Sequence, residues 1–366
     1  MVDTHGTCTD RFTPVRAALA ASLADKDVGA SVAVFVDGEP EVDLWGGHLD
    51  AERTIPWERD TLVNVWSSTK TMTALCALIL ADRGALDLDA PVAAYWPEFA
   101  AAGKEGVRVS HLLSHTAGLP VFDAPTTLED LYDWPTATAR LAAQAPAWEP
   151  GTDVGYHAVT QGYLVGEVVR RVTGRSLGAF FAEEVAGPLG ADFHIGLAAE
   201  HDHRVAPILP PPSSPPRRGP KPNPVIPPDT ANTLAWRRAE IPAAGGHGNA
   251  RSIAAIQSLP ACGGAARGVR LLSEKGCERL LEEQFNGTDR ILGVPLRWGL
   301  GYALDTGHLP NPRTCFWGGW GGSLVLVDLD ARVSVAYAMN QMLDDGGLVD
   351  DRAFQILAAV YEGLTA

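Results

Sequence analysis

Residues 62–80 read LVNVWSSTKTMTALCALIL and contain Ser67-Ser-Thr-Lys70, an S-x-x-K motif. The apolar run at 62–66 is typical of a short strand, and the apolar spacing of residues 69–80 predicts a helix. Because residues three apart lie on one face of a helix, we expect Lys70 to lie beneath the Ser67 hydroxyl. A lysine whose pKa is depressed can act as the base that a serine nucleophile needs, and N–H groups at the helix start favour an oxyanion.

The S-x-x-K motif alone is a weak signal, because many surface helices have a serine N-cap followed by a solvated lysine. Here apolar residues stand on both sides of the motif, among them Val65 before it and Met72 and Leu75 after it. This context predicts a buried helix. A buried lysine needs a partner or a function, which favours chemistry at Ser67.

The order of predicted elements indicates the fold class. Apolar runs at both ends of the chain predict strands, helical periodicity dominates residues 85–200, and a further helix closes the chain at 352–364. The predicted strands cover residues 31–36, 41–45, 297–304, 323–329 and 333–339. We therefore predict an α/β (α+β) fold with an antiparallel sheet flanked by helices. One discontinuous α/β domain would comprise residues 1–84 and 240–366, around a mainly helical domain at 85–239.

Residues 207–228 are half proline, and the basic residues among them are Arg217, Arg218 and Lys221. Such a composition does not build a packed core, so the segment is predicted to be an extended loop within the helical domain. Its local positive charge suggests a second interpretation, in which the loop shapes substrate entry.

Composition excludes several functional classes. The 366 residues carry a net charge of -15, which disfavours binding to phosphate backbones or anionic membranes. The five cysteines form no C-x-x-C pair, so neither a disulfide framework nor a zinc site is expected. The chain shows neither a secretory leader nor a run of about eighteen apolar residues, which predicts a cytoplasmic protein. No cofactor or metal is expected.

A second serine motif, Gly174-Arg-Ser-Leu-Gly178, matches the G-x-S-x-G nucleophile elbow. That elbow requires a strand before the serine, whereas the sequence predicts a helix at 161–172. Gly174 is suited to end this helix, and Ser176 to cap the next one. We interpret the motif as helix punctuation.

Further motifs follow Ser67 and Lys70 in a definite order. They are Leu112-Leu-Ser-His-Thr-Ala-Gly-Leu-Pro120, Trp148-Glu-Pro-Gly-Thr152 with Tyr156, Gly162-Tyr-Leu-Val-Gly166, Gly245-Gly-His-Gly248 with Ala250-Arg251, and Trp317-Gly-Gly-Trp-Gly-Gly-Ser323. The set resembles the serine β-lactamase and penicillin-binding-protein superfamily, with its closest likeness to class C β-lactamases and family VIII carboxylesterases. The resemblance covers residues 12–364.

The resemblance implies roles for three residues. Ser67 would be the nucleophile that forms the acyl-enzyme, Lys70 its proton partner, and Tyr156 a general base in acylation and deacylation. Because a free tyrosine titrates near pH ~10, Tyr156 would have to be ionised or hydrogen-bonded to Lys70. A neighbouring lysine ammonium is expected to lower its pKa.

The family's K-T-G strand corresponds to Trp317-Gly318-Gly319, and the register implies that the Trp320 and Ser67 amides form the oxyanion hole. A structural alternative for the glycine-rich run is a β-bulge or bend. Two departures weaken recognition of a β-lactam carboxylate and amide: Trp317 replaces the lysine of K-T-G, and Ala158 replaces the asparagine of Y-x-N. Trp317 would give substrate an apolar wall, although strand alternation can instead direct a tryptophan into the core.

The histidines receive smaller roles. His157 and His247 are candidate substrate-binding residues, and His115 is expected to be a hydrogen-bonding residue behind the site. His201 and His203 form an H-x-H pair without a nearby third ligand, so a metal site is not predicted there.

These residues together predict a metal-independent serine hydrolase that cleaves carboxylic esters through acyl-Ser67. The substrate would be a small, uncharged and partly apolar ester or amide. The alternatives are an acyltransferase or amidase with the same machinery, a β-lactamase or D,D-peptidase, and a non-catalytic ligand sensor. No nucleic-acid or membrane partner is expected, and the oligomeric state stays open.

Overall fold

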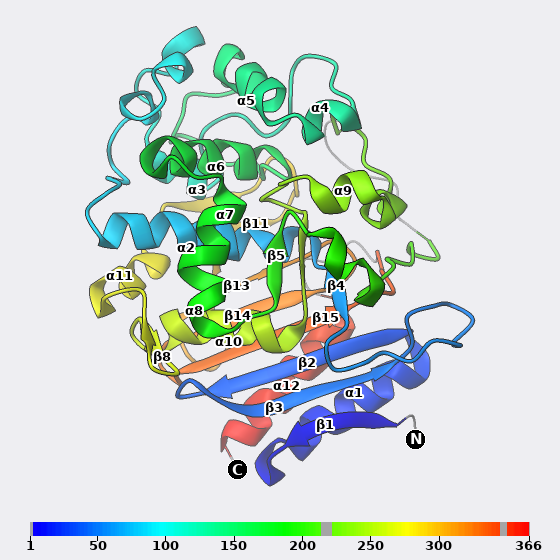
Figure 1. Cartoon of the computed structure of the whole chain (residues 1–366). Coiled ribbons are helices and arrows are strands. Elements are labelled where there is room, and N and C mark those ends of the chain that lie inside the picture. Colours follow the sequence, from blue (N-terminus) through cyan, green and yellow to red (C-terminus); the bar gives the residue numbers. More distant parts are fainter. Residues whose placement is uncertain (1–2, 214–221, 345–349, 366) are drawn as a thin grey trace.

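Strands from both ends of the chain meet in one nine-stranded antiparallel sheet (Figure 1). The computed structural model describes residues 3–213, 222–344 and 350–365. From one edge to the other, the strands are β1 (Thr4–Cys8), β3 (Glu39–Gly47), β2 (Gly29–Val36), β15 (Val333–Met339), β14 (Leu324–Asp328), β13 (Thr314–Gly318), β12 (Ala303–Leu304), β11 (Pro295–Trp298) and β10 (Phe285–Thr288). Strands β2 and β15 pair with Val34 opposite Val335, which joins the two ends of the chain.

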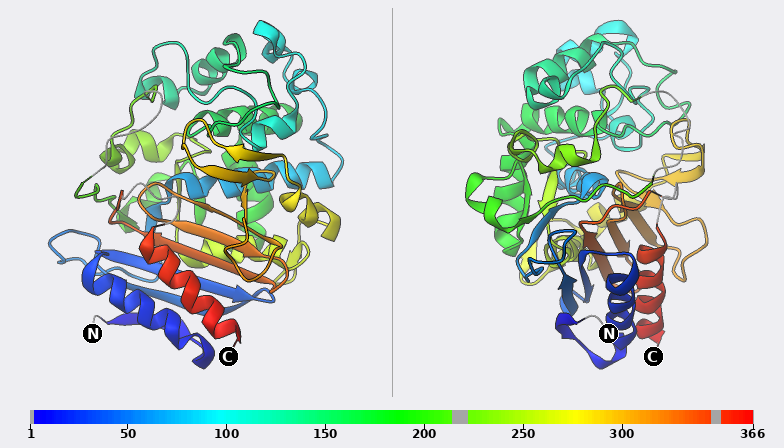
Figure 2. Two further views of the ribbon diagram at one scale, coloured as in Figure 1. Left: turned by 180° about the vertical axis from the view of Figure 1, so that it is seen from behind. Right: turned by 90° about the vertical axis from the view of Figure 1, so that its right-hand side faces the viewer.

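Helices cover both faces of this sheet. The terminal helices α1 (Thr13–Asp25) and α12 (Asp351–Thr365) lie side by side on one face (Figure 2). Helix α10 (Ala250–Ala261) packs on the other face, against β2, β14 and β15. The predicted apolar stripe of α1 is buried, as Val15 and Leu19 show, so amphipathic spacing explains how the helix meets the sheet.

The middle of the chain is mainly helical. Its helices are α3 (Val109–Leu113), α4 (Leu128–Tyr132), α5 (Trp134–Ala143), α6 (Thr160–Thr173), α7 (Leu177–Phe181), α8 (Gly187–Leu189) and α9 (Leu234–Arg238). Helix α11 (Glu274–Glu278) follows β8 (Ala265–Ala266) and β9 (Val269–Arg270), which pair with each other. The domain boundaries at 84/85 and 239/240 stay a prediction.

A second sheet crosses the predicted domain boundary. Its four strands, in order, are β5 (Phe193–Ile195), β7 (Gly246–Gly248), β4 (Leu62–Asn64) and β6 (Val205–Ala206). The middle segment is therefore not purely helical. Strands of two or three residues are too short for an alternating pattern to show in the sequence.

The predicted strand at 297–304 is wrong as a single element, because β11 and β12 are separate strands of a hairpin. Gly301 turns the chain between them with a φ of +89°, a left-handed conformation that glycine adopts without strain. A Cβ on Gly301 would lie 2.1 Å from the Ala74 Cβ, so the turn also needs the missing side chain. Edge strand β1 lacked an apolar signal because most of its residues are exposed.

The G-x-S-x-G motif is helix punctuation, as predicted. Gly174 ends α6 with a φ of +72°. The Ser176 Oγ caps α7 by accepting the Ala179 N–H at 3.2 Å, and it donates to Glu240 Oε1 at 2.5 Å.

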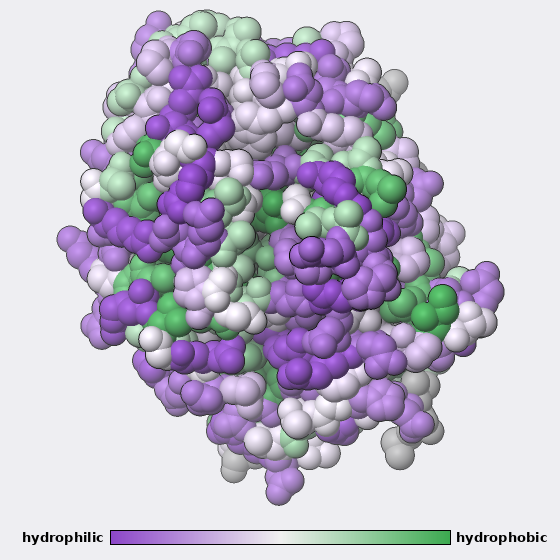
Figure 3. All heavy atoms as spheres, viewed as in Figure 1, coloured by the Kyte–Doolittle hydropathy of each residue, from purple (hydrophilic) through white to green (hydrophobic). Residues whose placement is uncertain are grey.

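Hydrophilic residues predominate on the face shown in Figure 3, where hydrophobic residues form separate small patches. Across the described ranges, every helix is too short or too polar to span a bilayer. The proline-rich loop is anchored at its far end, where the Asn223 side chain donates to the Phe122 and Ala124 carbonyls. Arg217, Arg218 and Lys221 lie outside the described residues.

Candidate active site

Ser67 is partly exposed, whereas every other residue between Thr61 and Leu80 is buried. It lies in a 3-10 turn (Trp66–Ser68) that leads from β4 into helix α2 (Thr69–Asp82). Trp66 adopts a φ of +45°, a left-handed conformation that bulky residues seldom take. This strained turn presents one hydroxyl at the surface of an otherwise buried segment, and strain of this kind is commonly found at functional sites.

Lys70 lies one turn below Ser67, as the motif predicts. Its side chain is 1% exposed, and its Nζ is 3.3 Å from Ser67 Oγ. The same Nζ donates to the Ala158 carbonyl at 2.7 Å and to the Ala243 carbonyl at 2.9 Å. Burial lowers the pKa of Lys70 well below its usual value, because charge is costly away from water.

These partners determine what Lys70 can do. A neutral amine has two N–H donors and one lone pair, and the two carbonyls accept both donors. In the neutral form of Lys70, the lone pair is therefore left for the third partner, Ser67. Burial, which lowers the pKa of Lys70, favours this form.

Tyr156 completes the group on the other side of Ser67. Its Oη accepts a hydrogen bond from Trp317 Nε1 at 3.1 Å, and its ring face lies 4.7 Å from Lys70 Nζ. Burial raises the pKa of Tyr156, although hydrogen bonds with Ser67 and Trp317 partly offset the effect. The expectation that a lysine ammonium lowers this pKa is wrong, because the effect of burial dominates and the pKa of Tyr156 is raised.

Hydrogen bonds connect these side chains. Trp317 donates to Tyr156 Oη, and a hydrogen bond links Tyr156 to Ser67. Lys70 Nζ lies 3.3 Å from Ser67 Oγ. The serine oxygen thus lies between the Tyr156 phenol and the Lys70 amine.

Asp289 anchors the backbone of Tyr156, and sequence reasoning missed it. Its fully buried carboxylate accepts the Tyr156 N–H at 3.0 Å through Oδ1, which also accepts the N–H groups of Ile291 and Leu292 at 2.9 Å each. The carboxylate also contributes to the raised pKa of Tyr156. Because Asp289 acts on backbone N–H groups from a distant loop, no sequence spacing indicates it.

The glycine-rich segment after β13 lies against the nucleophile turn. A Cβ on Gly319 would lie 2.2 Å from the Val65 carbonyl oxygen, so only glycine allows this approach. The ring of Trp320 packs on that of Trp66, with centroids 5.2 Å apart, which brings Trp320 beside the serine. Gly318 and Gly319 are partly exposed.

Trp317 is buried instead of lining an open wall. It is 4% exposed, and its ring packs between Trp298 and Tyr156, with centroid distances of 4.7 and 5.0 Å. Strand alternation thus directs this tryptophan inward, and its indole N–H donates a hydrogen bond to Tyr156 Oη.

The two histidines predicted to bind substrate are fully buried. His157 is fully buried; its Nε2 accepts the Leu119 N–H at 2.9 Å, and its Nδ1 bonds to the Gly155 carbonyl at 2.6 Å. His247 is also fully buried, and its Nδ1 bonds to the Gly245 carbonyl. His115 accepts the His157 N–H at 3.1 Å, which places it behind the site as expected.

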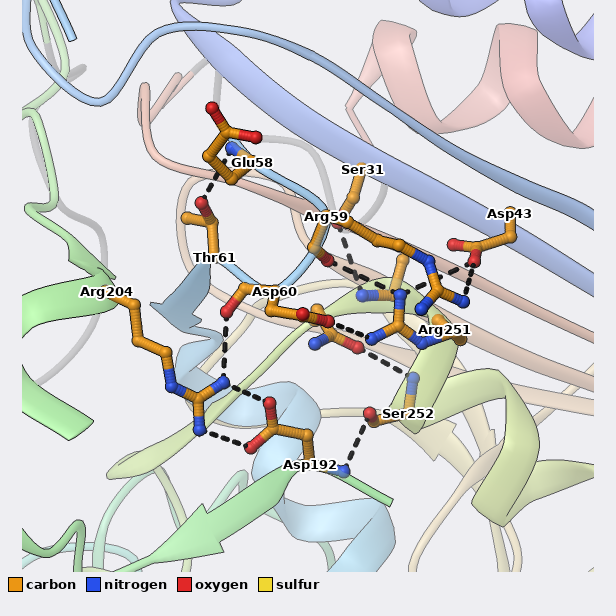
Figure 4. A network of polar contacts seen from close by, with 12 residues as sticks. Ser31, Asp43, Glu58, Arg59, Asp60, Thr61, Asp192, Arg204, Arg251 and Ser252 are labelled. Carbon is orange, nitrogen blue, oxygen red and sulfur yellow. Dashed lines mark hydrogen bonds and ion pairs between the residues drawn. The ribbon is translucent and has the colours of Figure 1, made fainter. Parts of the chain in front are cut away.

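A network of charged residues holds the loop that enters β4 (Figure 4). Arg251 pairs with Asp60 at 2.7 Å and with Asp43 of β3 at 3.4 Å. Arg204 donates to the Asp60 carbonyl at 3.1 Å and pairs with Asp192. Two arginines from different elements, Arg251 and Arg204, thus hold Asp60 in the loop that leads into β4.

These features define a class of protein. The family model for beta-lactamase matches residues 15–360, so the chain belongs to the beta-lactamase family. Within the described part of the chain, no cluster of three or more histidine, cysteine, aspartate or glutamate side chains could hold a metal ion.

Within this family, the chain is similar to esterases and to a penicillin-binding-protein homologue. The chain is 34% identical to Esterase/beta-lactamase LipL of Mycobacterium tuberculosis over 95% of this chain and 86% of that protein. The crystal structure of a family VIII carboxylesterase has a TM-score of 0.93 and 44% identity, and the match covers 99% of this chain and 100% of that one. A penicillin-binding-protein homologue from Caulobacter crescentus has a TM-score of 0.92 and 37% identity, with coverage of 99% and 100%. The predicted family resemblance and fold class are confirmed.

Proposed function

We propose that this protein is a serine hydrolase that cleaves small carboxylic esters through a covalent acyl-Ser67 intermediate. The observation that carries the proposal is the partly exposed Ser67 hydroxyl between the buried Lys70 amine and the buried Tyr156 phenol. The similarity to a family VIII carboxylesterase and to an esterase/beta-lactamase supports ester hydrolysis as the activity.

Acylation begins when Ser67 Oγ attacks the ester carbonyl and its proton passes to the lone pair of Lys70. The carbonyl oxygen becomes negative, and the backbone amides of Ser67 and Trp320 stabilise it. When the bond to the leaving oxygen breaks, the proton passes from Lys70 to the leaving alkoxide with the Tyr156 phenol as relay. The acyl group is then esterified to Ser67, and both proton carriers are back in their starting states.

Deacylation repeats these steps with water. Lys70, neutral again, takes a proton from a water that attacks the acyl carbonyl. The bond from the carbonyl carbon to Ser67 Oγ breaks, and the proton returns to Oγ. An alcohol or amine in place of water would give acyl transfer by the same steps.

The local chemistry favours an uncharged, partly apolar ester. Trp66 and Trp320, whose rings are in contact, belong to the two segments that meet at Ser67, and the Tyr156 ring lies over Lys70. Lys70 is buried, its pKa is lowered, and its Nζ donates to the Ala158 and Ala243 carbonyls. Among the described residues, these aromatic rings favour apolar groups of a substrate over a carboxylate.

A second candidate, β-lactam hydrolysis, is favoured by the similarity to LipL. Against it, Trp317 stands where the family has a carboxylate-binding lysine, and its N–H is committed to Tyr156. We expect turnover of nitrocefin to be at least 100-fold slower than that of p-nitrophenyl acetate.

The test compares two serine variants with the same ester. Ser67→Ala should lose turnover and labelling by a fluorophosphonate. Ser176→Ala, the matched control from the G-x-S-x-G motif, should keep both. Full turnover by Ser67→Ala, or loss in Ser176→Ala alone, would refute the proposal.

A further inference from the structure

Two buried serines connect the nucleophile turn to the glycine-rich segment. Ser68 and Ser323 are 0% and 3% exposed, and their Oγ atoms lie 2.9 Å apart. Ser323 Oγ also donates to the Val65 carbonyl at 2.8 Å. Neither hydroxyl has a part in the proton transfers proposed above.

The number of hydroxyl hydrogens determines which of the two serines is the donor in the hydrogen bond between them. Ser323 has one hydroxyl hydrogen, and the Val65 carbonyl accepts it. The hydrogen between the two serines must therefore come from Ser68. Ser323 is the central member of the chain, because it receives one hydrogen bond and donates the next.

The two ends of the chain belong to the two halves of the proposed oxyanion hole. Val65 and Ser68 enclose Ser67, and the Val65 carbonyl also accepts the Ser68 N–H at 3.2 Å. On the other side, the Ser323 carbonyl accepts the Gly319 N–H at 2.8 Å, which closes the loop that contains Trp320. Ser323 Oγ lies close to the Gly319 backbone, because a Cβ added to Gly319 would lie 2.3 Å from it.

We propose that Ser323 is a positioning residue which, with Ser68, sets the separation between the Ser67 and Trp320 amides of the oxyanion hole. This inference rests on the proposed acyl-enzyme chemistry. The two amides meet a full negative charge only in the transition state, so an error in their separation affects kcat and leaves substrate binding nearly unchanged.

The test uses p-nitrophenyl acetate and a phenylboronic acid, whose tetrahedral boron adduct on Ser67 places a hydroxyl in the oxyanion hole. Ser323→Ala should lower kcat by roughly 10- to 100-fold with KM within about twofold, the range expected for a displaced oxyanion donor. Its affinity for the boronic acid should fall by a similar factor.

The double variant gives a sharper test. Ser68→Ala leaves the Ser323–Val65 hydrogen bond in place and should have a smaller effect than Ser323→Ala. Because Ser68 acts through Ser323, Ser68→Ala/Ser323→Ala should be no slower than Ser323→Ala alone.

The matched control is Ser334→Ala. Ser334 is also fully buried and donates to a carbonyl, that of Ala254 at 2.7 Å, but it lies between β15 and α10. This variant should lower the melting temperature about as much as Ser323→Ala while kcat stays within about twofold. Equal kcat in the Ser323→Ala and Ser334→Ala proteins, or a loss that appears only in KM, would overturn the inference. Turnover by Ser67→Ala would instead refute the acyl-enzyme chemistry itself.

Discussion

At the scale of single residues, the site depends on two buried groups whose pKa values move in opposite directions. Burial lowers the pKa of Lys70 and raises that of Tyr156, so it favours the neutral form of both side chains. In these forms, an amine lone pair and a phenol lie beside the same serine oxygen without net charge. Of the two states that the family resemblance implied for Tyr156, ionised or hydrogen-bonded to Lys70, the raised pKa disfavours the ionised one.

The pH dependence of kcat/KM should reflect the ionisation of Lys70 and Tyr156. Lys70 is protonated below its depressed pKa, so kcat/KM should fall as the pH drops through that value. Because the pKa of Tyr156 is raised, activity should not fall up to about pH 9. Lys70→Met should lower kcat/KM by roughly 10³-fold at pH values above the pKa of Lys70, and its residual activity should show no acid limb. An acid limb that persists in residual Lys70→Met activity would contradict the assignment.

Lys104 provides a control for the Lys70→Met variant. Lys104 is also fully buried, and its Nζ donates to the carbonyls of Ala101, Ala142 and Gln144. Lys104→Met should destabilise the protein but keep kcat within about threefold.

Trp317 should act on turnover through its N–H group. Trp317→Phe keeps an aromatic ring but removes the donor 3.1 Å from Tyr156 Oη, and we expect kcat to fall by about 3- to 10-fold, the value of one hydrogen bond. Trp298→Phe is the control, because the Trp298 N–H has no partner among the described residues. Steady-state kinetics in which both variants behave alike would exclude this role.

At the scale of elements, the geometry of the active site depends on the close approach of two chain segments. The turn that contains Ser67 and the segment after β13 are far apart in sequence, and Gly319 allows their backbones to meet. The S-x-x-K motif and the glycine run were visible in the sequence. Their contact was expected only through the family resemblance, because apolar spacing does not report long-range pairing.

Gly319→Ala should therefore disrupt this junction. The added Cβ would lie 2.2 Å from the Val65 oxygen, a contact that only a backbone shift relieves. We expect kcat to fall by about 100-fold or more. Gly106→Ala is the control, because its Cβ would meet nothing within 4 Å, and it should leave kcat unchanged. Full activity in Gly319→Ala would show that the approach is not required.

At the scale of the whole molecule, the fold class followed from strands at both chain ends and helices between them. Ser67, Lys70 and Tyr156 were identified from motif order, and the structure brings them together. Asp289 was missed because it contacts the Tyr156 backbone across 133 residues of sequence. His157 was predicted to bind substrate, whereas its ring nitrogens are bonded to backbone groups.

Buried neutral histidines should make the whole fold sensitive to acid. Burial lowers the pKa of both His157 and His247 to about 3, below the ordinary value of 6.5. As the pH falls below 6.5, the unfolded chain takes up these protons and the folded protein does not until about pH 3. The free energy of unfolding should therefore decrease, by about 2 kcal/mol per histidine at pH 5.

Urea unfolding at pH 7.5, 6 and 5 measures this effect. His157→Gln should flatten the pH dependence, although it also lowers stability at pH 7.5. His203→Gln, at an exposed position, should leave the pH dependence unchanged. Equal slopes in all three proteins would contradict the explanation.

Rapid-quench mass spectrometry can detect a covalent acyl group on Ser67 directly. The protein is mixed with a p-nitrophenyl ester and quenched in acid within its first turnover, and the intact mass and its peptides are measured. We expect a mass increase equal to the acyl group, located on the peptide that contains Ser67 and absent in Ser67→Ala. Turnover with no added mass, or an acyl group on another residue, would contradict it.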